Sequence, residues 1–186
     1  MDYERQQFES TRDKVNKVSS LTIRNLNTIT GGNSFCYMIT MGYSLTDRRP
    51  SFIVQGTYPL YDVTARIVDI SVPPPTNQGV TPEGYAQRFA DYLRQAEVIY
   101  PVGNIGGGTT LDLSPNGALP FPMSHQKFNI FFSARNGFWQ ELYRSVEVGG
   151  STARAIRVTR SSQPHDVMLE KVDKNFPLGP DGKVQW

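Results

Sequence analysis

The chain has 186 residues with 16 Gly and 13 Pro, and its formal net charge is +2. This length allows one domain of ordinary size with an appendage, and so many Gly and Pro residues favour short strands and turns over long helices. The small net charge gives no reason to expect binding to nucleic acid or to an anionic membrane.

A single cysteine, Cys36, excludes an internal disulfide and a metal site made of cysteines alone. It lies in the apolar run 35–38, so we expect it to pack as a small hydrophobe rather than to act as a reactive thiol. Residues 1–12 are polar and charged and do not resemble a signal peptide, and no run of ~18 apolar residues predicts a membrane span. We expect the chain to be soluble as given; an anchor upstream of Met1 stays open, and the compartment is not predicted.

Residues 1–30 are predicted to form a long helix, because they contain neither Gly nor Pro. Within it, seven residues follow at alternating steps of three and four, the a/d pattern of a coiled coil. These seam residues are Phe8, Thr11, Val15, Val18, Thr22, Asn25 and Ile29. A lone helix with so narrow an apolar stripe is difficult to stabilise. We therefore favour self-association into a homo-oligomer, with packing along the chain's own β domain as the alternative.

Residues 31–175 are predicted to form one β domain. Apolar and β-branched segments predict strands at 34–41, 51–57, 59–70, 98–102, 109–113 and 167–172, with a turn at 42–51. They also predict a hairpin at 127–146 and a turn followed by a strand within 146–160. A short helix is predicted near 81–96, with its apolar stripe lying across one end or edge of the sheets. The pattern predicts a mainly β fold, an antiparallel two-sheet β-sandwich, with a barrel as the alternative. Residues 176–186 are predicted to be an extended C-terminal tail.

The strongest local signal is Asn136-Gly137, a hairpin turn between two runs rich in β-branched and aromatic residues. A two-residue loop at this point predicts that Phe132 lies opposite Glu141. Since side chains alternate between sheet faces, one face gathers Phe128, Ile130, Phe132, Ala134, Trp139 and Tyr143. Glu141 shares this apolar face, where it would need an arginine or a hydrogen-bond donor unless it lies at the rim.

The other face of the hairpin is predicted to be a contact surface made of Arg135, Phe131, Phe138 and Arg144. Arginine between aromatic side chains can hold an anionic glycan or a single-stranded nucleic acid through stacking and charge. A solvated outer face, with arginine stems covering the aromatic rings, is the alternative.

No catalytic, cofactor-binding or metal-binding residue is predicted. The glycine-rich segment 103–108 lacks the third-position glycine of a dinucleotide fold and any phosphate-loop lysine. His125 and His165 occur without a nucleophile elbow and without spaced carboxylates, so neither a serine hydrolase nor a zinc site is indicated. A non-enzymatic role is favoured, and an enzyme of unrecognised type stays open.

Three motifs follow the polar helix: GGNSFCY at 31–37, PLYDV at 59–63 and ARNG at 134–137. Together they resemble a group of uncharacterised bacterial proteins in which a coil, often membrane-tethered, leads into a β domain. The resemblance implies this order of elements and the possibility of a missing tether, and it brings no known activity. The chain departs from the tethered pattern because it shows no apolar anchor.

We therefore predict a non-enzymatic interaction or scaffold domain that self-associates through its N-terminal helix, and we keep open that it is the soluble part of a tethered protein. Its partner would be an unidentified protein or glycan, without cofactor; nucleic acid is not favoured. The alternative is a carbohydrate- or other ligand-binding β-sandwich that uses exposed aromatic residues such as Phe138.

Overall fold

The computed structural model describes residues 2–44, 47–113, 118–122, 126–161 and 163–186. The elements follow one another as α1 (Asp2–Thr30), β1 (Phe35–Ser44), β2 (Asp47–Gln55), β3 (Leu60–Asp69), α2 (Pro82–Ala96), β4 (Glu97–Ile105), β5 (Thr110–Asp112), β6 (Lys127–Ala134), β7 (Gly137–Val148), β8 (Ser151–Arg160) and β9 (Gln163–Val172). The fold is mainly β, as predicted. Strands β1 and β2 take in most of the segment 42–51, for which the sequence had indicated a turn.

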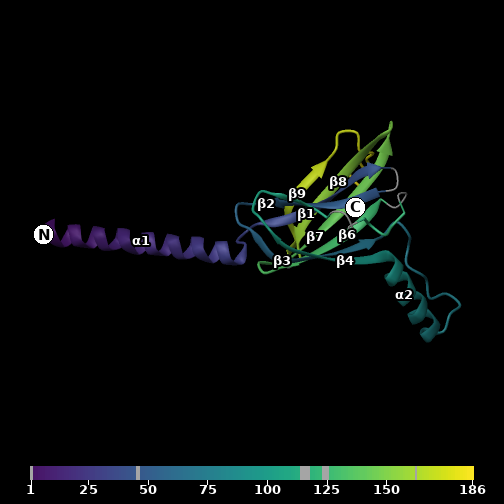
Figure 1. The fold of residues 1–186 in the computed structure, drawn as a ribbon, viewed down its shortest axis with the longest axis horizontal. Coiled ribbons are helices and arrows are strands. Elements are labelled where there is room, and N and C mark those ends of the chain that lie inside the picture. Colours follow the sequence, from purple (N-terminus) through teal and green to yellow (C-terminus); the bar gives the residue numbers. More distant parts are fainter. Residues whose placement is uncertain (1, 45–46, 114–117, 123–125, 162) are drawn as a thin grey trace.

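The strands form two antiparallel sheets that pack face to face (Figure 1). The smaller sheet has the order β1-β2-β5 and the larger has the order β4-β3-β6-β7-β8-β9. Apolar side chains from both sheets share one core. For example, the ring of Phe52 on β2 meets the ring of Phe132 on β6 edge-on, with 6.1 Å between the ring centres. The structure confirms the predicted antiparallel two-sheet β-sandwich with a long N-terminal helix and a shorter second helix.

The β6–β7 hairpin has the predicted faces but a different register. Ala134 pairs with Gly137 and Phe132 pairs with Trp139, so the two loop residues are Arg135 and Asn136. The predicted turn at Asn136-Gly137 was therefore displaced by one residue. Because this displacement changes each cross-strand partner by two residues, every side chain keeps its predicted face, and the six predicted core residues do line the interior or its margin.

Contacts to other strands explain why the turn is placed at Arg135 and Asn136. The Arg135 backbone N–H donates to the Tyr61 carbonyl at 3.0 Å. The Asn136 side-chain amide donates to the carbonyls of Gly32 and Ser34, at 3.1 and 2.6 Å. These long-range bonds fix the loop against β3 and against the segment that joins α1 to β1, and such partners cannot be read from the local turn signal.

Helix α1 stands away from the sheets, and its far end shares no surface with them (Figure 1). It ends where predicted: Gly31 has a φ of 94°, a left-handed conformation that favours glycine. The Gly31 backbone N–H closes the last turn by donating to the Asn27 carbonyl at 2.9 Å. The alternative in which α1 packs along its own β domain does not describe this structure.

Helix α2 begins as predicted, with the Thr81 side chain accepting a hydrogen bond from the Gly84 backbone N–H. It does not lie across the sheets, however, and projects from the end of the sandwich opposite α1 (Figure 1). Ala96, at its C-terminal end, is its buried residue. Along the helix, the ring of Tyr85 stacks on that of Phe89, and the ring of Tyr92 lies tilted beside Phe89, instead of packing into the core.

Candidate functional site

The most extensive candidate surface is the apolar stripe of α1. Val15 and Val18 are 61% and 63% exposed. The same stripe and its flanks expose further large apolar side chains, namely Phe8, Leu21, Leu26 and Ile29. A row of exposed apolar residues that continues over a whole helix is a feature of surfaces that are covered by a partner.

Two of the polar seam residues are compatible with burial. The hydroxyl groups of Thr11 and Thr22 donate to the carbonyls of Gln7 and Val18, four residues earlier, at 2.8 and 2.9 Å. These hydroxyl protons already have acceptors within the helix. Burying either threonine against another helix would therefore leave no donor unpaired.

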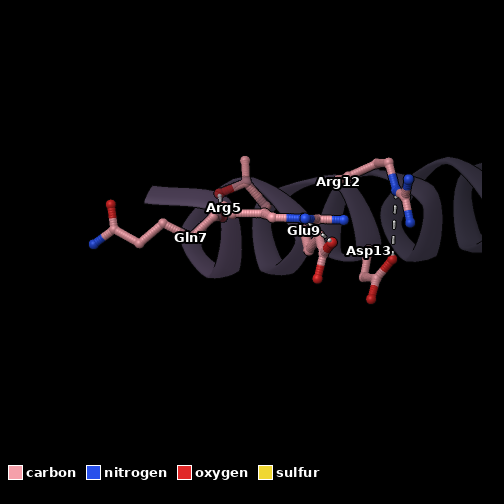
Figure 2. A network of polar contacts seen from close by, with 6 residues as sticks. Arg5, Gln7, Glu9, Arg12 and Asp13 are labelled. Atoms are coloured by element: carbon pink, nitrogen blue, oxygen red, sulfur yellow. Dashed lines mark hydrogen bonds and ion pairs between the residues drawn. The ribbon is translucent and has the colours of Figure 1, made fainter. Parts of the chain in front are cut away.

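Charged residues of α1 lie off the seam. Figure 2 shows Arg5 beside Glu9 and Arg12 beside Asp13, with nitrogen–oxygen distances of 3.5 and 3.9 Å. Such exposed pairs add little stability, about 0.2–1 kcal/mol each. What matters is where the charged residues lie, because none of them occupies any of the seven predicted seam positions.

A second candidate feature is a row of polar contacts inside the sandwich, between β7 and β1. The Trp139 indole N–H donates to the Cys36 carbonyl at 2.7 Å, and the Met38 backbone N–H donates to Glu141 Oε2 at 2.7 Å. One step further along both strands, the Thr40 and Tyr143 hydroxyl oxygens are 2.6 Å apart. We call these three contacts the β1–β7 ladder.

The ladder satisfies the free edge of a buried strand. Strand β1 pairs only with β2 in its sheet, and alternate residues of such an edge strand direct backbone groups away from the sheet. Two neighbouring contacts continue the row, because the carbonyls of Ser34 and Thr40 accept from Asn136 and Arg154. Side chains of the large sheet thus replace the missing strand.

Glu141 is the unusual member of the ladder, since its side chain is fully buried. Removal from water raises its pKa well above the usual value, and the hydrogen bond from Met38 opposes this only in part. Its second oxygen, Oε1, has no hydrogen-bond partner among the described residues. The pKa shift favours the neutral acid. The sequence predicted that Glu141 either meets an arginine or a hydrogen-bond donor on the apolar face or lies at the rim, and the structure shows the donor, the Met38 backbone N–H.

Cys36 lies in the same interior and is fully buried. Burial raises the pKa of its thiol, and a negative charge on Glu141 would raise it further. Since the thiolate is the nucleophilic form, this cysteine has the environment of an unreactive packing residue, as predicted. The full burial of Glu141 likewise leaves it without access to a substrate, so we assign the ladder a structural role.

The predicted contact surface is divided by the structure. Phe131 and Phe138 lie on the outer face and are 37% and 69% exposed. Arg135 is near them in the chain but is tied to Asp62 by an ion pair of 2.8 Å and lies over the Tyr61 ring. Arg144 is only 4% exposed and lies six residues beyond Phe138 on β7, roughly 20 Å away. Phe131 and Phe138 lie on the same face of neighbouring strands, and Arg144 belongs to a different environment.

No group of three or more metal-ligating side chains is present within the described ranges. His125 lies outside the described residues, and the surroundings of the His165 side chain are likewise not described. No helix in the described part of the chain is both long enough and apolar enough to cross a membrane.

Comparison with protein-family models, with curated proteins and with solved structures finds no match to this chain. The resemblance to coil-tethered bacterial β domains therefore stays a prediction.

Two features of the structure were not predicted from the sequence. One is the β1–β7 ladder, although the alternation of Trp139, Glu141 and Tyr143 on one face of β7 was a signal that polar tips enter the core. The other is the burial of Arg144. Its alternation with core residues placed it on the outer face, but the chain segment that covers that face could not be recognised.

Proposed function

We propose that this protein is a non-enzymatic scaffold domain that associates with further copies of itself through α1. The observation that supports the proposal most is the exposure of Val15 and Val18 in the middle of a seam with coiled-coil spacing. In the oligomer, the α1 helices bury this seam against one another. Each helix carries its β-sandwich at its own C-terminal end, so the sandwiches are held together.

The length of α1 also favours a partner. A helix of 29 residues extends about 44 Å, and α1 has few contacts with the sandwich to stabilise it (Figure 1). In proteins, most of the stability of a helix comes from packing of its apolar face. A second copy of the chain supplies that packing, because the seam of one α1 packs against the identical seam of the other.

The energies are of the right order for association. Full burial of Val or Ile contributes roughly 1.5–3 kcal/mol, so three such residues on each of two helices contribute on the order of 10 kcal/mol. This is comparable with the cost of association, about 4–15 kcal/mol. The flanking residues Leu21 and Leu26 add apolar surface, so we expect an association that depends on protein concentration.

Paired lysine substitutions test the proposal. The change Val15→Lys with Val18→Lys places charge on the seam, whereas Asn16→Lys with Ser20→Lys adds the same charge on the outer side of the helix. We expect the first variant to be monomeric and the second to associate like the wild type in sedimentation equilibrium. If the seam variant associates as strongly as the wild type, α1 is not the interface.

A second candidate function is ligand binding by the exposed aromatic residues of β6 and β7, which the exposure of Phe138 favours. Aromatic rings of this kind stack on sugars or on other flat ligands. A glycan array probed with the wild type and with Phe138→Ala tests it, and Phe89→Ala, which removes an exposed ring on α2, is the matched control. Binding that is absent, or that survives Phe138→Ala, would rule out this candidate.

A further inference from the structure

The outer face of the large sheet carries a cavity of about 400 Å³, within the range typical of small-molecule sites. Its floor is formed where β6 and β7 run side by side, and the C-terminal tail forms its opposite wall. The lining includes Ser71, Lys127 and Arg144 on the side of the sheet and Phe176, Pro177 and Gln185 from the tail. The tail is held over the sheet at Trp186, whose ring lies 4.4 Å from the Arg157 guanidinium carbon.

Arg144 is the central residue of this cavity, because it is a buried cation that has no carboxylate partner among the described residues. Its Nη1 donates to the carbonyls of Phe128 and Tyr143, both at 2.8 Å, and its Nη2 donates to Asn129 Oδ1 at 3.2 Å. All three acceptors are uncharged, and a guanidinium has five N–H donors. Two donors are therefore not used by these bonds.

Burial of the guanidinium is costly in this arrangement. Removal from water lowers the pKa of Arg144, and the described residues form no ion pair with it. A buried charge is normally compensated by an opposite charge. The neutral acceptors compensate it only in part, and a mobile anion in the adjoining cavity would complete the compensation.

The remaining polar lining is also rich in donors. Ser71 Oγ accepts from the backbone N–H groups of Gln126 and Lys127, at 3.0 and 3.1 Å, which leaves its proton free to be donated. Lys127 is exposed and has no ion pair among the described residues. No carboxylate side chain is among the described residues that line the cavity. Two carboxylates lie near the lining residues along the chain: Glu147, next to Val146, accepts from the Thr152 hydroxyl, and Asp69 accepts from the Ser71 backbone N–H and lines a different cavity.

We propose that this cavity binds a small oxyanion, with a phosphate group as the chemical class, held between Arg144 and Lys127 under the C-terminal tail. Arginine supplies directed N–H donors and lysine a point charge, the usual pair of side chains for phosphate recognition. Because the tail forms one wall, the bound anion also holds the tail to the sheet. The site is independent of α1 and of the proposed self-association.

Titration of the full chain with inorganic phosphate, followed by calorimetry at constant ionic strength, tests the proposal. We expect saturable binding to the wild type, and a rise in the midpoint of thermal unfolding with phosphate concentration. Lys127→Glu should weaken the binding at least about tenfold, since it replaces an attracting charge by a repelling one. Lys17→Glu, the same change on the exposed side of α1, should leave it unaltered.

Arg144→Met should weaken phosphate binding at least as strongly, but this variant also removes three buried hydrogen bonds and is informative only if circular dichroism shows it folded. Lys127 is exposed, so Lys127→Glu keeps the test decisive in either case. If the wild type binds no phosphate, or if Lys127→Glu binds it as well as Lys17→Glu does, the proposal is wrong.

Two further ligands distinguish the sources of the phosphate group. Binding of glycerol 3-phosphate that is sensitive to Lys127→Glu supports a soluble phosphorylated ligand. Binding of the protein to phosphatidic acid vesicles with the same sensitivity, and without binding of glycerol 3-phosphate, supports a lipid headgroup. Vesicle binding that Lys17→Glu reduces as much as Lys127→Glu does would show general attraction to the surface and would overturn the assignment to this cavity.

Discussion

Glu141 on β7 accepts a hydrogen bond from the backbone N–H of Met38 on β1, and this bond of 2.7 Å joins the two sheets through a fully buried carboxyl group. It occupies the centre of the β1–β7 ladder. The edge of the smaller sheet is thereby closed by side chains rather than by another strand, and the stability of the sandwich should depend on their protonation and hydrogen bonding.

The raised pKa of Glu141 makes stability dependent on pH. In the unfolded chain the carboxyl titrates near its usual value of 4.5, whereas the folded protein keeps its proton to a higher pH. The folded state therefore binds more protons than the unfolded state in the interval between the two pKa values. The contribution of Glu141 to the free energy of unfolding is fully present below the pKa of the unfolded chain. It is lost as the pH rises through the pKa of the folded protein, by up to about 1.4 kcal/mol per pH unit.

Glu141→Gln isolates this effect, because the amide keeps the acceptor for Met38 and cannot ionise. We expect urea unfolding to show the variant gaining stability relative to the wild type as pH rises from 5 to 8. A difference between the two proteins that stays constant over this interval would mean that Glu141 is not protonated in the folded state.

Trp139→Phe removes the indole N–H that donates to the Cys36 carbonyl. The loss of a buried hydrogen bond together with some packing should lower the free energy of unfolding by about 1–3 kcal/mol. Trp186→Phe is the matched control, since Trp186 lies on the tail and outside the core, and it should cost clearly less. Equal losses for both variants in denaturant unfolding would show that the ladder bond contributes nothing.

The contact between Thr40 and Tyr143 is suited to a double-mutant cycle. Tyr143→Phe leaves the Thr40 hydroxyl without this partner, and Thr40→Val does the same to Tyr143. Each single change should cost about 1–3 kcal/mol, and the double variant should cost less than the sum of the two. Strict additivity in the unfolding free energies would contradict a direct bond.

The junction between α1 and the sandwich depends on Asn136, whose amide holds the carbonyls of Gly32 and Ser34. Asn136→Ala should destabilise the protein by about 1–3 kcal/mol. Arg135→Ala, in the same turn, removes an exposed ion pair with Asp62 and the contact with the Tyr61 ring, and should cost at most about 1 kcal/mol. Thermal unfolding of both variants checks this order, and the reverse order would contradict the assigned role of Asn136.

The elements of the fold could be predicted from sequence because their signals are local. Alternation located the faces of β6 and β7, the absence of Gly and Pro from 1–30 located α1, and Gly31 located its end. The register of the hairpin was missed because Asn136 is held by bonds to Gly32 and Ser34, more than a hundred residues away in the chain. Local turn preference carries no information about such partners.

The contact surface illustrates the same limit. Alternation correctly placed Arg144 and Phe138 on one face, but burial depends on what covers the face. Arg144 lines a cavity whose other wall is the tail and is buried, whereas Phe138 is exposed, and nothing in the residues of β7 distinguishes the two positions. In contrast, α1 was predictable over its whole length, and helical spacing alone determines which of its side chains share a stripe; association through that stripe stays a prediction.

The molar mass of the full chain in solution tests the proposed self-association most directly. The chain has a mass of 20.9 kDa. Light scattering coupled to size-exclusion chromatography, over a series of loading concentrations, should give a mass that rises to an integral multiple of this value. A mass that stays at 20.9 kDa at every concentration, and is the same for the wild type and for the variant with lysine at positions 15 and 18, would contradict the proposal.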